Sequence, residues 1–195
     1  MDYIEKLRIV YDIYLDGLDC SISEEEINEV EKELGLTLPI PLKEFYLVFG
    51  ACEELLKSNY AIALPNELYQ ENNILYFAAE NQGVCNYGVN IYTHELTYID
   101  KNQIEPMEEE LDDFLLYLLA LQGSEFLPCA GVIYDELSEV EEHLSKLTRS
   151  INTPVFYDVK GLIGCYDGEN VVFAGTDEDT FDQFVDESDL TIDYL

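Results

Sequence analysis

The sequence of 195 residues contains no tryptophan, only two histidines and only nine lysine and arginine residues. His94 and His143 have no cysteine or second histidine at the spacing of metal ligands, so no zinc site is expected. Against 42 acidic residues, the nine basic residues leave a net charge of −33. Because nucleic acids and anionic membranes attract basic surfaces, this balance argues against binding to either of them.

The cysteines and the apolar runs exclude two further classes. Five cysteines, an odd number without a Cys-x-x-Cys pair, do not make a disulfide framework. No run reaches the roughly 18 apolar residues that suggest a membrane span. The first 17 residues also lack the apolar core of a signal peptide, with acids at positions 2 and 5. We therefore expect a cytoplasmic protein with reduced cysteines.

Motifs of catalytic and cofactor sites are missing too, with no GxGxxG, P-loop, GxSxG or HExxH pattern. Cys85 and Cys165 stand in strand-like segments, where cysteine behaves as a small buried apolar residue. Asp177 and Asp179 have calcium-loop spacing, but Phe181 occupies a ligand position, so a helix N-terminus explains the segment better. We expect no metal and no cofactor, and the absence of an assembled site favours binding over catalysis.

Hydrophobic residues, at 48%, are abundant, with 15 tyrosines and 9 phenylalanines among them. Disordered acidic segments contain few aromatics, whereas a chain of this length and composition can bury a core. The charge must therefore cover a folded protein. It would attract basic partners over about 8 Å at physiological salt, although solubility alone is an alternative explanation.

Apolar residues at helical spacing predict most helices. Ser23 and Glu26 form a capping-box pattern before one of them, and Gly35 is a stop signal. Pro41 and Gly50 bound the aromatic helix that follows. The sequence predicts helices over 2–16, 24–34, 41–49 and 108–121.

Short segments rich in Ile, Val, Tyr and Phe predict a sheet within 60–101 and three further strands between 154 and 175. The segment 135–150 predicts a helix with its cations at the C-terminal end. Thr176 is expected to cap a last helix. The predicted fold class is α+β, with a mostly antiparallel sheet flanked by helices.

Four segments, in this order, resemble the SUKH superfamily of Smi/Knr-type domains. The shared pattern is a capped helix, an aromatic helix ending at a glycine, and a strand ending in Glu-Asn-x-Gly. Phe49-Gly50 stands where the superfamily usually has Asn-Gly, and residues 123–195 lie outside the match. The segments are ISEEEINEVEKELGLTLPIPLKEFYLVFG (22–50), LPNELY (64–69), ILYFAAENQGVCNYGV (74–89) and EELDDFLLYLLALQ (109–122).

The resemblance implies a non-enzymatic α+β domain. We assign residues 1–122 to this SUKH-like domain with its N-terminal helix, and we expect residues 123–195 to form a C-terminal extension of a helix, a meander and a helix packed on the same core. Bacterial members look like immunity proteins that bind and neutralise a toxin, often a nuclease, whereas fungal relatives are cell-wall regulators. An immunity protein is the leading hypothesis. A regulatory protein-interaction module without a toxin is the alternative, and a hydrolase using carboxylates or Cys165 is the least favoured.

An immunity protein with this charge would occupy the basic substrate groove of a toxin, with carboxylates in place of phosphates. Tyr87 and Tyr92 are candidate aromatic anchors. A solvated face or the core is the alternative for each candidate. The candidate carboxylates are Glu105, Glu108, Glu109, Glu110, Asp112 and Asp113 in one cluster, and Asp135, Glu136, Glu139, Glu141 and Glu142 in another.

Overall fold

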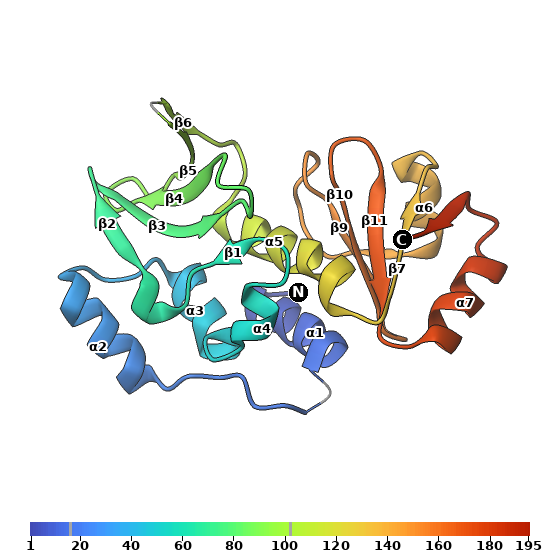
Figure 1. Ribbon diagram of the computed structural model, residues 1–195, viewed down its shortest axis with the longest axis horizontal. Helices are drawn as coiled ribbons and strands as arrows, with labels where there is room; N and C mark the ends of the chain where they lie inside the picture. The colour runs from blue at the N-terminus through green and yellow to red at the C-terminus, as the bar shows by residue number, and fades with distance from the viewer. Residues whose placement is uncertain (16, 102) are drawn as a thin grey trace. The chain divides into compact units, whose positions relative to one another are not determined.

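The computed structural model describes residues 1–15, 17–101 and 103–195. The chain divides into two compact units (Figure 1). The central unit is Asp19–Leu115, and the terminal unit combines Met1–Leu18 with Leu116–Leu195. The division between Leu115 and Leu116 falls inside one continuous helix, α5 (Leu111–Phe126).

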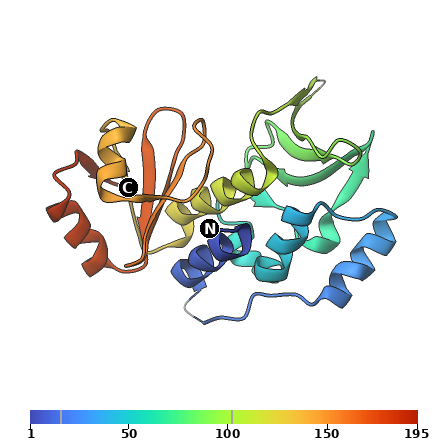
Figure 2. The same cartoon turned by 180° about the vertical axis from the view of Figure 1, so that it is seen from behind.

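The described residues of the central unit form six strands in one antiparallel sheet, in the order β1-β3-β4-β5-β6, with β2 paired to β3. Helices α2, α3 and α4 lie on one side of this sheet (Figures 1 and 2). The helices are α2 (Glu24–Leu34), α3 (Ile40–Phe49), α4 (Glu53–Leu56), the 3-10 helix η1 (Pro65–Glu67) and the start of α5. The strands are β1 (Ala61–Ile62), β2 (Tyr69–Glu71), β3 (Ile74–Ala79), β4 (Asn86–Asn90), β5 (Leu96–Asp100) and β6 (Gln103–Pro106).

Local signals start and stop α2 and α3. The predicted capping box is confirmed, because Ser23 Oγ accepts from the Glu26 amide at 3.2 Å and Glu26 Oε2 accepts from the Ser23 amide at 2.8 Å. Gly35 ends α2 at a φ of +69°, which glycine adopts without steric cost. At Gly50, after α3, a Cβ atom would lie 2.9 Å from Ile22 Cγ1, so glycine is what lets Ile22 pack there.

Aromatic side chains build the core of the central unit. Phe45 and Phe49 of α3 are fully buried, with ring centroids 5.8 Å apart. Phe77 and Tyr87 of the sheet contact Phe114 at the start of α5, at 6.5 and 4.9 Å. The aromatic helix that stands out in the sequence is therefore a core element.

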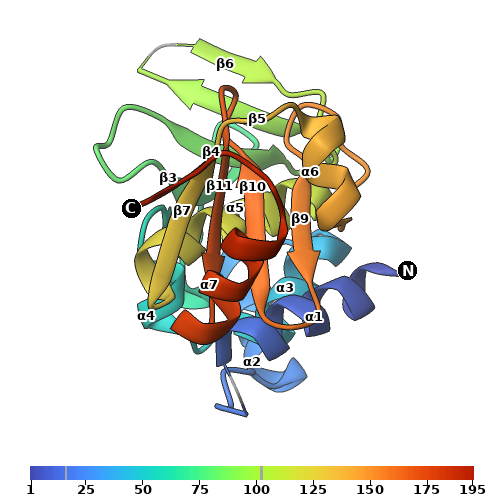
Figure 3. The same ribbon diagram turned by 90° about the vertical axis from the view of Figure 1, so that its right-hand side faces the viewer.

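In the part of the terminal unit that the structure describes, six strands form an antiparallel sheet in the order β12-β7-β11-β10-β9-β8. Helix α7 lies on one side of this sheet and α1 on the other (Figure 3). The helices are α1 (Tyr3–Leu15), the remainder of α5, α6 (Leu137–His143) and α7 (Glu178–Glu187). The strands are β7 (Cys129–Ile133), β8 (Ser145–Lys146), β9 (Val155–Asp158), β10 (Leu162–Tyr166), β11 (Val171–Gly175) and β12 (Ile192–Tyr194).

Alternating side chains explain why helices cover both faces of the terminal sheet. On one face, Phe173 stacks on Phe181 of α7, with ring centroids 4.7 Å apart. On the other face, Ala174 lies against Gly123 of α5. The Tyr14 hydroxyl of α1 donates to the Leu119 carbonyl of α5 at 2.6 Å, which joins these two helices.

The α+β class is confirmed, as are the helix over 24–34 and the strands between 154 and 175. The predicted helix over 2–16 appears as α1, and residue 16 lies outside the described residues. The predicted boundary after residue 122 falls inside α5. A domain over 1–122 with an extension sharing its core stays a prediction.

Two helix predictions in the terminal unit were wrong in detail. The segment 135–150 is helical only over Leu137–His143, because Leu144 is extended and Leu147 donates its amide to the Val155 carbonyl at 2.7 Å. The predicted C-terminal cations therefore lie outside α6. Asp177, not Thr176, caps α7 by accepting from the Thr180 amide at 2.8 Å. Strands β6, β7, β8 and β12 were not predicted.

Candidate protein-binding surfaces

The first predicted acidic cluster contributes three exposed carboxylates. Glu105 lies on β6, and Glu108 and Glu110 lie in the segment before α5. The side chains of these three residues form no hydrogen bond or ion pair within the described chain. We call Glu105, Glu108 and Glu110 the acidic triplet.

The other members of the first cluster are less accessible. Glu109 and Asp112 are half-buried, and Asp113 is only 2% exposed. Because α5 begins at Leu111 and not at residue 108 as predicted, only Asp112 and Asp113 belong to its first turn. Asp113 is therefore not part of an exposed acidic face.

Most of the second cluster takes part in local structure. The Asp135 carboxylate accepts from the Thr191 amide and hydroxyl. Glu139 Oε2 accepts from the Glu136 amide at 3.2 Å at the start of α6. Glu141 Oε1 lies 3.8 Å from Lys146 Nζ. The exposed Glu142 has no such side-chain partner among the described residues.

The two candidate tyrosines lie in different environments. Tyr87 packs against Phe114 and Tyr98, with ring centroids 4.9 and 5.9 Å away, and burial is the main reason that its pKa is raised. Tyr92 is 76% exposed in the turn between β4 and β5. Of the two, only Tyr92 is exposed enough to anchor a partner from the surface.

The residues considered for chemistry do not assemble into a catalytic arrangement. Cys165 is fully buried, and burial raises the pKa of its thiol, so the nucleophilic thiolate is disfavoured. His94 lies in a turn at a φ of +61° and is exposed. His143 is exposed, and its ring forms no hydrogen bond with a described hydroxyl group. No three described His, Cys, Asp or Glu side chains are close enough to hold a metal ion.

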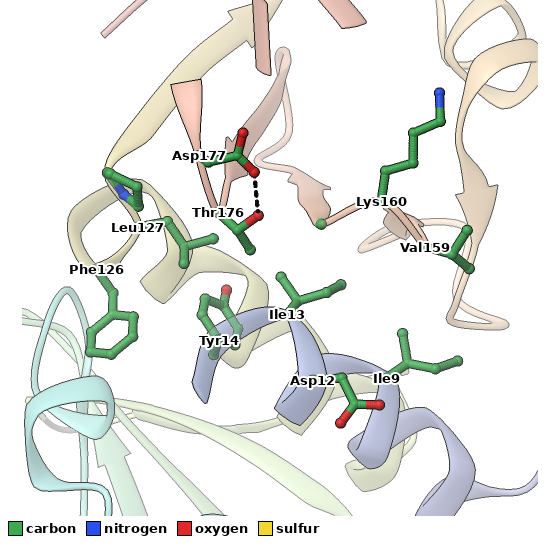
Figure 4. Close-up of a pocket in the computed structure, with 12 residues that line it drawn as sticks. Ile9, Asp12, Ile13, Tyr14, Phe126, Leu127, Val159, Lys160, Thr176 and Asp177 are labelled. Carbon is green, nitrogen blue, oxygen red and sulfur yellow. Dashed lines mark hydrogen bonds between the residues drawn. The ribbon is translucent and has the colours of Figure 1, made fainter. Parts of the chain in front are cut away.

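A pocket of about 650 Å³ in the terminal unit was not predicted (Figure 4). Ile13 of α1 contributes to its apolar part, and the β9–β10 turn contributes Lys160. Asp12 and Asp177 also line it, and Asp177 Oδ2 lies 3.2 Å from Thr176 Oγ1. The pocket thus presents both signs of charge.

A groove of about 400 Å³ in the central unit was also not predicted. It lies between α2, the end of α3, the start of α4 and η1, and its charged lining residues are all glutamates. The glutamates of α2 can be identified in the sequence, but the residues on the opposite wall of the groove come from a separate segment of the chain. The sequence therefore did not predict the groove. We call this site the glutamate groove; it has carboxylates from Glu26, Glu29, Glu33 and Glu53 and apolar walls from Ile22, Val30, Leu64 and Pro65.

The sequence pattern of the SMI1 / KNR4 family (SUKH-1) matches residues 21–187. The chain belongs to this family. The match extends past residue 122, where the resemblance in the sequence ended, and so includes most of the terminal unit. Comparisons with curated proteins and with solved structures give no match.

In this SUKH-1 chain, the residues that carried the resemblance are mainly structural. Gly50 accommodates Ile22, and Gly83 adopts a φ of +69° in a turn where its amide donates to the Glu80 carbonyl at 2.9 Å. Tyr87 belongs to the aromatic core. The family pattern thus indicates the fold. No helix in the described part of this SUKH-1 chain is long and apolar enough to cross a membrane.

Proposed function

We propose that this SUKH-1 chain is a non-enzymatic immunity protein that binds a basic protein toxin, such as a nuclease, in the cytoplasm. It neutralises the toxin by occupying the groove in which the toxin binds its own substrate. The observation that carries this proposal is a net charge of −33 with exposed, unpaired carboxylates at Glu105, Glu108 and Glu110.

Unpaired surface carboxylates favour association more than folding. Mutual repulsion among like charges opposes compaction, whereas a basic partner gains from every carboxylate within about a Debye length. Such charges steer the encounter and raise the association rate, and the desolvated centre of the interface governs dissociation. Tyr92, 76% exposed, can supply aromatic contact area.

Two features support binding over catalysis. The candidate nucleophile Cys165 is buried with a raised thiol pKa. The exposed His143 has no described hydroxyl within hydrogen-bond reach of its ring, so a base and a nucleophile are not paired there.

The test begins with the reading frames next to the gene. A toxin encoded there is purified, and its association with this protein is followed by stopped-flow fluorescence from low to high salt. We expect steep slowing with salt and survival of toxin-exposed cells that express the protein. Without a toxin frame or without protection, the proposal is wrong and a regulatory interaction module becomes the better account.

Substitution of the acidic triplet locates the surface. Glu105→Gln, Glu108→Gln and Glu110→Gln together should lower the low-salt association rate about tenfold, the lower end of electrostatic steering. The matched control changes the exposed Glu125, Glu169 and Asp186 of the terminal unit to amides, with the same change in net charge. An equal loss in the control would assign the effect to net charge and not to the triplet.

A further inference from the structure

The glutamate groove combines apolar walls with negative charge that no lining cation neutralises. The side chains of Glu29, Glu33 and Glu53 are exposed and form no hydrogen bond or ion pair within the described residues. Glu26 is held ionised, because its hydrogen bonds from Ser23 lower its pKa. The volume of about 400 Å³ is typical of ligand sites, which span roughly 300–1,000 Å³.

This charge arrangement opposes the stability of α2. Glu29 and Glu33 are four residues apart on one helix face, where like charges destabilise a helix. Glu33 also lies in the last turn of α2, where the helix dipole disfavours an acid. Acids near the start of α2 stabilise the helix, but Glu33 does not, so local folding does not explain its charge.

The opposite wall of the groove is held by the fold. Glu53 is in the first turn of α4, and Leu64 and Pro65 stand at η1. Ile22 is fixed against Gly50, where a Cβ atom would lie 2.9 Å from Ile22 Cγ1. Apolar walls and carboxylates on both sides are therefore present before any partner binds.

The spread of the carboxylates defines the ligand. Because no three described carboxylate, thiol or imidazole groups converge to hold a metal ion, one compact cation would not satisfy the groove. Several cations spaced along an apolar backbone would satisfy it. Arginine and lysine fit this description, because their methylene stems cover apolar surface while their charged ends reach carboxylates.

We propose that the glutamate groove binds a segment of the toxin in which arginine or lysine residues alternate with aliphatic side chains. This proposal rests on the proposed immunity function and assigns one contact surface to it. Binding relieves the repulsion between Glu29 and Glu33. Removal of these charges should therefore stabilise the free protein and weaken the complex, as is common for functional sites.

The first experiment uses a synthetic peptide with three arginines alternating with leucines, labelled for fluorescence anisotropy. The full chain is compared with the triple variant Glu29→Gln, Glu33→Gln and Glu53→Gln. We expect at least tenfold weaker peptide binding together with a higher Tm. The control is the same amide variant of Glu125, Glu169 and Asp186. Wild-type affinity in the groove variant, or an equal loss in the control, would overturn the proposal.

The second experiment varies the probe, so that no apolar residue of the groove has to be changed. A peptide with leucines replaced by glycines keeps its charge and should bind at least fivefold more weakly. Spermidine carries spaced cations without aliphatic branches and should compete only weakly. If spermidine binds the groove as tightly as the peptide, the groove is a polyamine site and the proposal is wrong.

Experiments with the toxin distinguish the groove proposal from the proposed immunity function. If the acidic triplet variant loses association rate while the groove variant keeps wild-type association and dissociation, the immunity function stands and the groove proposal fails. If the unmodified protein gives no protection, the immunity function fails, and with it the identification of the segment as part of a toxin.

Discussion

The two sheets of this protein are of equal size but are covered differently. Helices lie on both sides of the terminal sheet (Figure 3), and four of the five residues in each of β10 and β11 are buried. In the central unit, α2, α3 and α4 lie on one side of the sheet (Figure 1), and the inner strands β4 and β5 are buried at only two of five positions each, although β3 is buried at five of six. A sheet covered on both faces needs apolar residues in succession, whereas one covered on a single face tolerates polar residues at alternate positions.

The face of the central sheet away from its helices is covered in part by its own side chains. Gly88 lies beneath Ile74 and Ile99, and a Cβ atom there would be 2.3 Å from Ile74 Cγ2. Beside them, Tyr69 and Tyr76 stack with ring centroids 4.6 Å apart. Close side-chain packing thus protects a sheet face where the terminal unit uses helices.

The candidate carboxylates also differ between the units, in whether other residues of the protein bond to them. In the terminal unit, Asp135, Glu139 and Glu141 bond to neighbouring residues. In the central unit, the acidic triplet and much of the glutamate groove lack such partners among the described residues. Among these candidates, the carboxylates that bond to other residues of the protein lie in the terminal unit, and those that remain available to a partner lie mainly in the central unit.

The largest expected effect tests whether the two units unfold together. Phe181→Ala in the terminal unit and Phe45→Ala in the central unit each remove a fully buried ring and should cost about 3–5 kcal/mol. Because α5 contributes to both units, we expect each variant to weaken hydrogen-exchange protection in both β4 and β10. Protection lost only in the mutated unit would show independent folding.

Two glycine substitutions compare packing of the sheets. Gly88→Ala brings a Cβ atom to 2.3 Å from the Ile74 side chain, and Gly164→Ala brings one to 2.7 Å from the Val172 carbonyl oxygen. Both should cost about 1–3 kcal/mol in urea unfolding. The loss of stability in the double variant of Gly88→Ala and Ile74→Ala should be smaller than the sum of the two single losses, because the methyl group added at Gly88 meets the Ile74 side chain. An additive loss in the double variant would contradict this account.

Each unit has a helix cap that acid should weaken, because hydrogen bonds lower the pKa of Glu26 at α2 and of Asp177 at α7. Hydrogen bonds from Thr180 lower the pKa of Asp177, so its stabilising effect is full above the unfolded pKa, about 3.9, and is lost as pH falls through the folded pKa. Asp177→Asn keeps a capping residue without this titration, and should narrow the Tm difference between neutral and acid pH. Asp179→Asn is the control. Ser23→Ala should instead cost about 1 kcal/mol at neutral pH.

The smallest expected effect concerns one ion pair from each unit. Lys57 Nζ lies 2.5 Å from Glu67 Oε2 in the central unit, whereas Lys146 Nζ and Glu141 Oε1 are 3.8 Å apart in the terminal unit. Double-mutant cycles should give coupling of about 0.2–1 kcal/mol for the first pair and less for the second. Both couplings should fall as salt rises. A larger coupling energy for the second pair would show that the distance between the charged atoms does not determine which pair contributes more.

Local sequence signals predicted the elements whose ends depend on neighbouring residues. Ser23 and Glu26 cap α2, and Gly35 ends it, through contacts within a few residues. Strand β8 was missed because Ser145 and Lys146 become a strand only by pairing with Tyr157 and Phe156. Its pairing partners are outside the local sequence window, so propensity favoured a longer helix.

The sequence by itself determined the α+β class, the acidic surface and the helix over 24–34, because composition and capping act through nearby residues and solvent. Tertiary structure decided which carboxylates are accessible, since Asp113 is buried while Glu110 is exposed. It also formed the glutamate groove, which needs Glu29 and Glu53 from different helices. Burial and distance depend on contacts between segments far apart in the chain, and no local pattern specifies those contacts.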